Sequence, residues 1–271
     1  MNGTENTGKF HKNAGIFFLM LHMTAVCIYI LVFRPGNMQD TSYWVYRIGA
    51  LADEMRIKGV LNALPPRILS VTFEGYGYGA PLYYCDVFLW IPAVFVLLGM
   101  SEFTSFTILC TAIWTARAFV AGYSANLVLK QFEEVTNRYG LSALFAFAYS
   151  CFPYMMEVLL VRGAIGESLA GIFFPLITAL LYTITHAVKK NCGHMILLAL
   201  GFWGVVCSHT ISIVITACCV VIYMLGNWKL FWRDKWKCSK RGCWPDLGAS
   251  GSIRSRRGGS ILYGYKCSES I

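Results

Sequence analysis

Arg162 and Glu167 have an unusual setting for charged residues, because they enclose Gly-Ala-Ile-Gly between two apolar segments. Ionisable side chains at membrane depth are costly, so they usually line a cavity or pair with each other. Arg162 is therefore a candidate to pair with Glu157 or Glu167, or to bind a phosphate, whose oxygens match the planar guanidinium. An ion pair that only fixes two helix ends is the alternative.

His209 follows Ser208 in a long segment without a charged side chain. A catalytic or metal-binding role fits this position, since imidazole changes its charge near neutral pH and ligates metals. A neutral histidine that a neighbouring helix satisfies explains it equally well. Cys238 and Cys243 lack the second pair of ligands that a structural zinc site needs. We therefore expect no metal.

Asp40 precedes a segment in which apolar residues recur with helical spacing. This stripe consists of Trp44, Ile48, Leu51 and Met55. The pattern predicts an amphipathic helix at the membrane interface, with Tyr43, Trp44 and Tyr46 at the level of the lipid headgroups. An aspartate directly before a helix is often only an N-cap, and this is the alternative to a chemical role for Asp40.

Three glycines alternate with two tyrosines in Gly75-Tyr76-Gly77-Tyr78-Gly79. Such a run cannot form a stable helix, and its glycines let the backbone approach a ligand or a neighbouring helix closely. A packed connector that leads the chain back to the membrane is the alternative interpretation.

The segments that must position these residues are those of a membrane protein. Of the residues, 56% are hydrophobic and 14% charged, with a mean hydropathy of +0.54, which excludes a soluble enzyme or a nucleic-acid-binding domain of ordinary composition. Apolar segments occur at about 14–33, 82–100, 103–123, 141–161, 168–188 and 194–225. We predict an all-α, polytopic transmembrane bundle in the cell membrane, whose first outer loop, 34–81, carries the interfacial helix.

Two topologies fit these segments. The basic residues of the loops after the third and fifth apolar segments place both loops in the cytoplasm, which puts Arg162, Glu167 and His209 on the outer face. This topology requires 82–123 to cross only once and 194–225 to be a pair of short helices. Six full crossings instead place the Arg/Glu run inside. We favour the first topology, because it gathers the unusual polar residues on one side.

Residues 228–271 form a tail that carries most of the net charge of +9. The tail has 10 Lys/Arg against 3 Asp/Glu, whereas residues 1–227 have 13 against 11. A basic segment after the last apolar segment is typical of a cytoplasmic end and attracts anionic lipid. We predict a disordered cytoplasmic tail, or the product of a shifted reading frame, after a membrane module at 1–227.

The order of these motifs resembles the bacterial polytopic membrane proteins labelled 6-pyruvoyl-tetrahydropterin synthase-related. The motifs are Asp40 before Tyr43-Trp44-Val45-Tyr46-Arg47-Ile48, Gly75-Tyr76-Gly77-Tyr78 with Pro81, Arg162-Gly163-Ala164-Ile165-Gly166-Glu167, and Ser208-His209. Despite the label, we expect no pterin chemistry. The family in turn resembles the GT-C integral membrane glycosyltransferases, which take a sugar from a polyprenyl-phosphate carrier at the outer face. The resemblance covers about 10–227 and implies a truncated N-terminal module.

The resemblance implies sugar transfer from a polyprenyl-phosphate carrier, with membrane lipid and no nucleic acid as partner. It assigns catalysis to Asp40, Glu167 and His209, and substrate binding to Arg47, Tyr76, Tyr78 and Arg162. Asp40 would take the proton from the acceptor hydroxyl, and the arginines would hold the carrier phosphate. Glu167 and His209 would orient one of these groups, while the tyrosines would stack on the sugar or line the lipid entrance.

Trp44 is a departure from the family, which usually has a histidine a few residues after the aspartate. The chain is also shorter than typical family members. Both departures favour the alternative function, a catalytically inactive membrane module that binds a lipid carrier or a partner protein. No cofactor is identified by the sequence.

Overall fold

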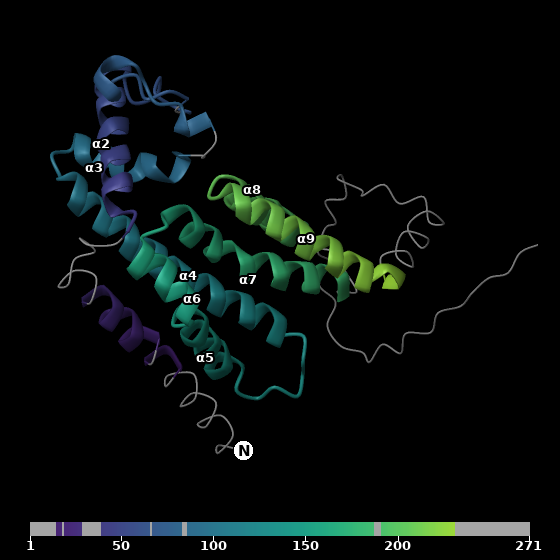
Figure 1. Cartoon of the computed structure of the whole chain (residues 1–271). Coiled ribbons are helices and arrows are strands. Elements are labelled where there is room, and N and C mark those ends of the chain that lie inside the picture. The colour runs from purple at the N-terminus through teal and green to yellow at the C-terminus, as the bar shows by residue number, and fades with distance from the viewer. Residues whose placement is uncertain are drawn as a thin grey trace, which may run out of the picture. The chain divides into compact units, whose positions relative to one another are not determined.

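The computed structural model of the protein describes residues 15–17, 19–28, 39–65, 67–82, 86–186 and 191–230 (Figure 1). The chain divides into two units, Met1–Asn227 and Trp228–Ile271. All helices discussed below belong to the first unit. The predictions for 231–271, including Cys238 and Cys243, lie outside the described residues.

Helices form the framework of the described residues. They are α2 (Thr41–Lys58), α3 (Trp90–Leu97), α4 (Glu102–Leu129), α5 (Arg138–Ser150), α6 (Pro153–Met156), α7 (Ile165–His186), α8 (Cys192–Val206) and α9 (Thr210–Gly226), preceded by an N-terminal helix, Gly15–Ile28. A π-helical segment, Glu157–Arg162, continues from α6. Within the described ranges the β pairing is limited to one antiparallel bridge, Leu69–Tyr78. The prediction of an all-α fold is therefore confirmed.

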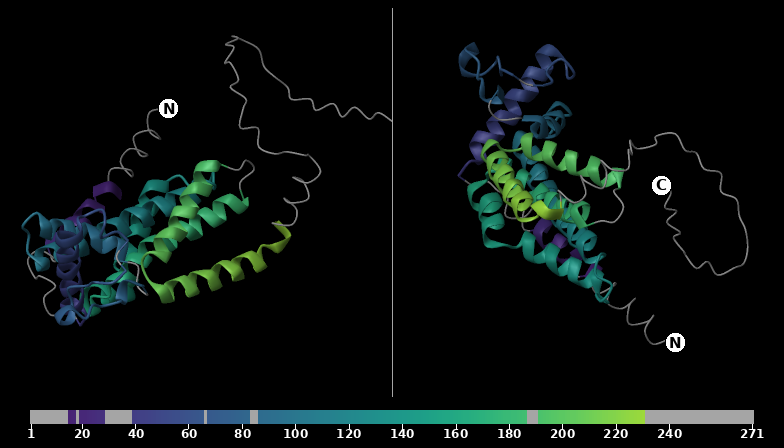
Figure 2. Two further views of the ribbon diagram at one scale, coloured as in Figure 1. Left: turned by 90° about the horizontal axis from the view of Figure 1, so that it is seen from above. Right: turned by 90° about the vertical axis from the view of Figure 1, so that its right-hand side faces the viewer.

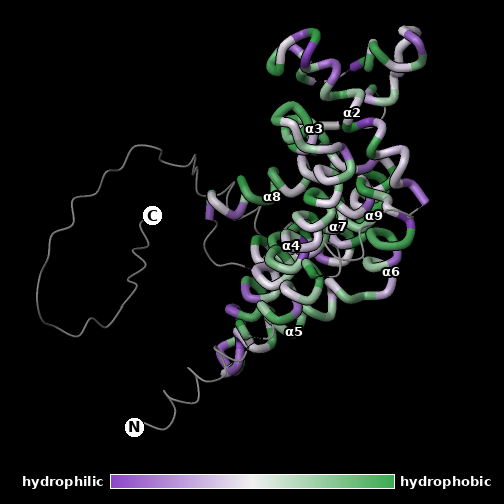
Figure 3. The backbone as a smooth tube through the Cα atoms, turned by 90° about the vertical axis from the view of Figure 1, so that its left-hand side faces the viewer, coloured by the Kyte–Doolittle hydropathy of each residue, from purple (hydrophilic) through white to green (hydrophobic). Residues whose placement is uncertain are grey.

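Two helices, α4 and α7, are long and apolar enough to cross a membrane. A third crossing results if α5 and Pro153–Arg162, which are bent by 57° to each other, count as one span. The N-terminal helix, α8 and α9 are apolar but shorter. Hydrophobic residues dominate long stretches of this bundle (Figure 3). The fold thus agrees with the membrane association that the composition predicts.

Two of the predicted apolar segments are not single spans. The segment 82–100 contains α3, whose eight residues rise only about 12 Å, well short of a hydrocarbon core of roughly 30 Å. The segment 194–225 is divided into α8 and α9, which diverge from a turn at 207–209 (Figure 2). The topology in which 82–123 crosses once and 194–225 is a pair of short helices stays a prediction.

Helix α2 carries the predicted apolar stripe on its buried face. Ile48 and Leu51 are completely buried, and Trp44 and Met55 are nearly so. This face packs against α3 and α4, so the helical period reflects burial in the protein core. Burial of each such side chain stabilises the fold by roughly 1.5–3 kcal/mol.

Helices α4 and α7 lie side by side and run in the same direction (Figure 1). Arg117 in α4 donates to the carbonyl of Ser168 near the start of α7, and Gln131, just after α4, donates to Thr183 near the end of α7. The N-terminus of α7 is therefore level with the middle of α4. The first half of α4 extends past it toward α2 and α3.

Candidate functional site at the start of helix α7

The Arg162–Glu167 run folds as a tight turn. Pro153 begins a new helix after α5, because a proline lacks the amide hydrogen that a continuing helix needs. The π-helical segment then ends at Gly163, whose φ of 68° lies in the left-handed region that glycine adopts without steric cost. Helix α7 begins two residues later. The turn places Arg162 and Glu167 next to each other.

Arg162 pairs with Glu167. Arg162 Nη1 donates to Glu167 Oε2 at 3.1 Å, and the Tyr154 hydroxyl donates to Glu167 Oε1. The Arg162 side chain is 40% exposed and that of Glu167 is 19% exposed. Of the two partners that the sequence offered, Glu167 rather than Glu157 is therefore the one used. The exposed arginine keeps donors on its second amino group that a ligand could accept.

Asp40 lies directly beside this pair. Its backbone N–H donates to the carbonyl of Arg162 at 2.8 Å, and the N–H of Gln39 donates to the carbonyl of Val161 at 3.2 Å. Asp40 occupies the N-cap position of α2, but its side chain makes no capping hydrogen bond. Its carboxylate is half-buried and is not consumed by the cap. The capping interpretation of Asp40 is therefore not realised in the structure.

His209 reaches the same turn from α9. A Cβ on Gly166 would lie 2.8 Å from the carbonyl oxygen of Ser208 and 3.5 Å from His209 Cδ2, so the close approach requires a glycine. The His209 Nδ1 atom and the Ser212 hydroxyl are 3.0 Å apart, which holds the ring at the start of α9. Gly166, the second glycine of the run, thus allows His209 to lie directly against the turn.

The charges of the turn act on His209. Burial lowers the pKa of the His209 imidazole, Glu167 opposes this shift, and Arg162 reinforces it. The neutral imidazole is therefore the form that the site favours near neutral pH, and it can accept or pass on a proton. Four predicted site residues, Asp40, Arg162, Glu167 and His209, are brought together here from three distant parts of the chain. We call this group, with Tyr154, the α7 cluster.

Arg47 lies in a different environment. It is completely buried, donates to the Tyr43 hydroxyl at 2.8 Å, and has its guanidinium carbon 5.1 Å from the ring centroids of both Tyr43 and Trp44. Burial and a hydrogen bond with Tyr78 raise the pKa of Tyr43 to about 12, against the opposing effect of Arg47. Arg47 is thus enclosed by aromatic rings and orders the first turns of α2.

The two tyrosines of the glycine-rich run are placed differently. Tyr78 exchanges both backbone hydrogen bonds with Leu69, at 3.0 and 3.1 Å, and its ring packs edge-on against Phe73. Tyr76 is 92% exposed. Gly75 and Gly77 have φ of 92° and 81°. The run is therefore a tight loop that is hydrogen-bonded to the chain at Leu69, as expected of a packed connector.

Tyr154 is the member of the α7 cluster that the sequence did not single out. Its only signal was its place directly after Phe152-Pro153, where a helix must restart. Its contact with Glu167 depends on the π-helical segment between the two residues. No periodic pattern in the sequence predicts such a segment.

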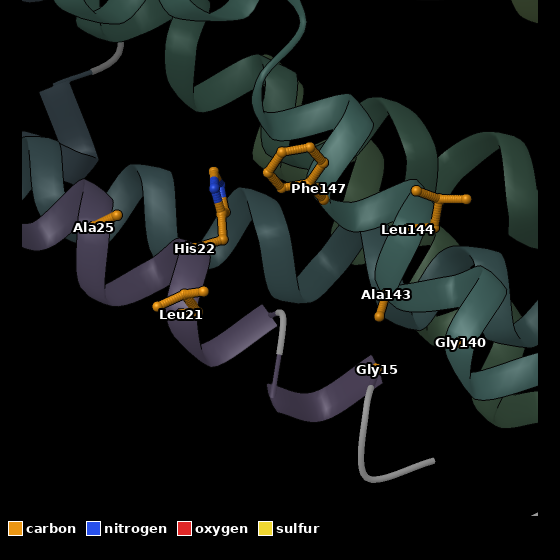
Figure 4. Close-up of a pocket in the computed structure, with 8 residues that line it drawn as sticks. All are labelled: Gly15, Leu21, His22, Ala25, Gly140, Ala143, Leu144 and Phe147. Atoms are coloured by element: carbon orange, nitrogen blue, oxygen red, sulfur yellow. The ribbon is translucent and has the colours of Figure 1, made fainter. Parts of the chain in front are cut away.

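A separate cavity of about 550 Å³ lies between the N-terminal helix and α5 (Figure 4). Its walls are apolar except for His22, whose ring meets Phe147 edge-on at a centroid distance of 4.9 Å. None of the predicted site residues lines this cavity. It is therefore not part of the α7 cluster.

The α7 cluster combines a free carboxylate, an exposed guanidinium and a neutral imidazole, which suits proton transfer beside a bound anion. Among the described residues, no group of three or more His, Cys, Asp and Glu side chains is placed to hold a metal ion. Comparisons with protein-family models, curated proteins and solved structures found no match to this chain.

Proposed function

We propose that the protein is a multi-pass protein of the cell membrane whose α7 cluster transfers a sugar from a polyprenyl-phosphate carrier to an acceptor at the outer face. The observation that carries the proposal is the convergence of Asp40, Arg162, Glu167 and His209. A general base and a phosphate ligand must contact the same substrate, and these residues all lie at or beside the turn that begins at Arg162.

Each side chain has a role in this scheme, in which His209 orients the acceptor or one of the other groups. The Asp40 carboxylate takes the proton from the acceptor hydroxyl as the new glycosidic bond forms at the sugar carbon. Arg162 binds the carrier phosphate and stabilises the charge that it gains as the bond between sugar and phosphate breaks. Glu167 holds Arg162 in place from one side, and Tyr154 in turn fixes Glu167.

The charges of the loops support an outward-facing cluster. Lys130 and Arg138 lie in the connection between α4 and α5, which the positive-inside rule places in the cytoplasm. The turn at Arg162 lies at the opposite end of the following helical segments and hence on the outer face. In this topology α2 lies on the outer side, with its apolar stripe packed in the protein core and Tyr43 and Tyr46 exposed.

The resemblance to the 6-pyruvoyl-tetrahydropterin synthase-related membrane proteins, and through them to GT-C glycosyltransferases, supplies the substrate class in this proposal. The α7 cluster supports the same class because it joins a base to a phosphate ligand outside an apolar bundle.

A second function, binding of a lipid carrier or a partner protein without turnover, is favoured by one observation. Trp44, which stands where the family usually has a histidine, is 8% exposed and packed in the core beside Arg47. It offers no proton acceptor to the α7 cluster. Without a histidine at this position, any proton transfer in the α7 cluster depends on Asp40 and His209 alone.

The experiment that tests both functions uses the full chain in lipid nanodiscs with radiolabelled sugars on undecaprenyl phosphate. Sugar transfer predicts release of undecaprenyl phosphate and a labelled acceptor, with a loss of at least about 100-fold in Asp40→Asn. The matched control is Glu133→Gln in the α4–α5 connection, which should keep full activity. Donor binding without release supports the non-catalytic module, and absence of donor binding overturns both sugar transfer and binding of a lipid carrier.

A further inference from the structure

Arg117 is a completely buried cation in the middle of α4. Its Nη1 donates to the carbonyl of Met155 at 2.9 Å, and its Nη2 donates to the carbonyl of Ser168 at 3.1 Å. Its Nε is buried with no hydrogen-bond partner, and no carboxylate forms an ion pair with it, among the described residues. Burying a guanidinium that only main-chain carbonyls bind costs desolvation free energy. Such a residue therefore suggests a role beyond packing.

The two carbonyls that Arg117 binds belong to the neighbours of two α7-cluster residues. Met155 directly follows Tyr154, and Ser168 directly follows Glu167. The side chains of Tyr154 and Glu167 hydrogen-bond to each other. A single guanidinium therefore ties together the two backbone segments whose side chains meet in the cluster.

These segments need such a tie. Met155 lies in the four-residue helix α6, between the break at Pro153 and the π-helical segment, so only a short stretch of α-helical hydrogen bonding fixes its position. Gly171 leaves room for the connection, because a Cβ there would lie 3.2 Å from Met155 Sδ and 3.7 Å from Arg117 Nε. An arginine holds its donors on separate nitrogens in a rigid plane and can span two carbonyls, whereas the three donors of a lysine share one nitrogen.

We propose that Arg117 is a positioning residue of the α7 cluster, which sets Glu167 against Tyr154 and through it orients Arg162. Arg117 touches no substrate in this scheme. The role rests on the proposed function only in so far as the cluster that it positions is the proposed site.

The test places 3-fluorotyrosine at position 154 of the full chain in nanodiscs and records its 19F resonance. Glu167→Gln, which weakens the bond to Tyr154, gives the reference shift. Arg117→Met should move the resonance in the same direction, and Arg117→Lys should move it less. The matched control is Gln131→Leu, which removes the other side-chain tie between α4 and α7, at the far end of α7, and should leave the resonance in place.

An unchanged resonance in Arg117→Met, beside a lowered Tm, would show that Arg117 only stabilises the bundle and would overturn the proposal. Gly171→Ala provides a second variant if Arg117→Met does not fold, because the added methyl group displaces Met155 or the guanidinium while keeping the charge. It should shift the resonance as well, and an unchanged resonance in this variant again overturns the proposal.

Binding of farnesyl phosphate, a short polyprenyl phosphate, separates this inference from the proposed function. The affinity of Arg117→Met should be at least about tenfold weaker than that of the wild type, with Gln131→Leu unchanged. If the wild type does not bind farnesyl phosphate, the proposed function fails, while the 19F shifts still decide the positioning role. If the wild type and Arg117→Met bind equally well, the positioning role is overturned.

Discussion

Gly166 is the residue on which the contact between α7 and His209 depends. Gly166→Ala places a Cβ 2.8 Å from the Ser208 carbonyl oxygen, a backbone atom that cannot turn away. We expect the free energy of unfolding to fall by about 1–3 kcal/mol, as for other overpacked positions. Gly226→Ala is the control, because nothing lies within 4 Å of its Cβ. Thermal unfolding of both variants in detergent measures the difference, and equal Tm values would contradict the close contact.

Glu54 ties the segment around Ser70 to α2. Its side chain is nearly completely buried, and Oε2 accepts from the N–H of Ser70 at 2.9 Å and from its hydroxyl at 2.7 Å, while Oε1 pairs with Lys58. Burial acts to raise the pKa of Glu54, but Lys58 and the Ser70 hydrogen bonds outweigh it, so the pKa is lowered. We expect Glu54→Gln to destabilise the fold by about 1–3 kcal/mol.

The pH dependence of this effect has a definite sign. A lowered folded-state pKa gives stability that is complete above the ordinary value of 4.5 and is lost as the pH falls through the folded-state pKa. The Tm difference between wild type and Glu54→Gln should therefore be present at about pH 7 and shrink at about pH 3. Asp53→Asn is the control, since Asp53 and its partner Arg56 are both 52% exposed and such pairs contribute about 0–1 kcal/mol. A Tm difference that grows on acidification would refute the assignment.

At the scale of elements, the break between α5 and α7 is what creates the α7 cluster. Gly163 ends the π-helical segment with φ of 68°, in the left-handed region where most residues with a Cβ are strained. Gly163→Ala should cost about 1–2 kcal/mol, and Gly163→Asn should cost less, because asparagine tolerates the left-handed region. Differential scanning calorimetry of the three proteins measures the order, and an alanine variant as stable as the wild type would mean that the turn is not left-handed.

The long elements could be predicted from the sequence because their signal is simple. Helices α4 and α7 are apolar over the length of a span, and α2 shows the period of a helix with one buried face. The direction of burial in α2 could not be predicted, since a stripe facing protein and a stripe facing lipid have the same period. The bounds of α3 could not be predicted, because the apolar segment 82–100 also includes the 3-10 helix Asp86–Leu89 directly before it.

The site was predictable only in part. Arg162, Glu167 and His209 stood out as polar residues in apolar surroundings, and Asp40 by its place before a helix. Tyr154 and Arg117 did not, because their roles come from a π-helical segment and from main-chain carbonyls, which leave no mark on sequence spacing. Arg47 was singled out as a ligand, yet its surroundings are the aromatic rings of α2.

For the whole molecule, a site at the outer face requires that the helices cross the membrane in one particular direction. Helices α4 and α7 run in the same direction, and the α7 cluster lies at the end of α7 that is far from the basic α4–α5 connection. In the proposed topology, the positive-inside rule assigns this connection and the basic tail to the cytoplasm and the cluster to the outer face. A sugar donor that is presented at the outer face could reach it.

Single-cysteine labelling of intact cells with an impermeant maleimide tests whether the α7 cluster lies on the outer face of the membrane. Cysteines replace Asp40, Arg162 or His209 in a chain whose 11 native cysteines have been removed, with exposed Glu133 in the α4–α5 connection as the cytoplasmic control. We expect labelling from outside at the first three positions and protection at Glu133 until the cells are opened. Protection of Arg162 or His209 while Asp40 is labelled would contradict the shared outer-face site.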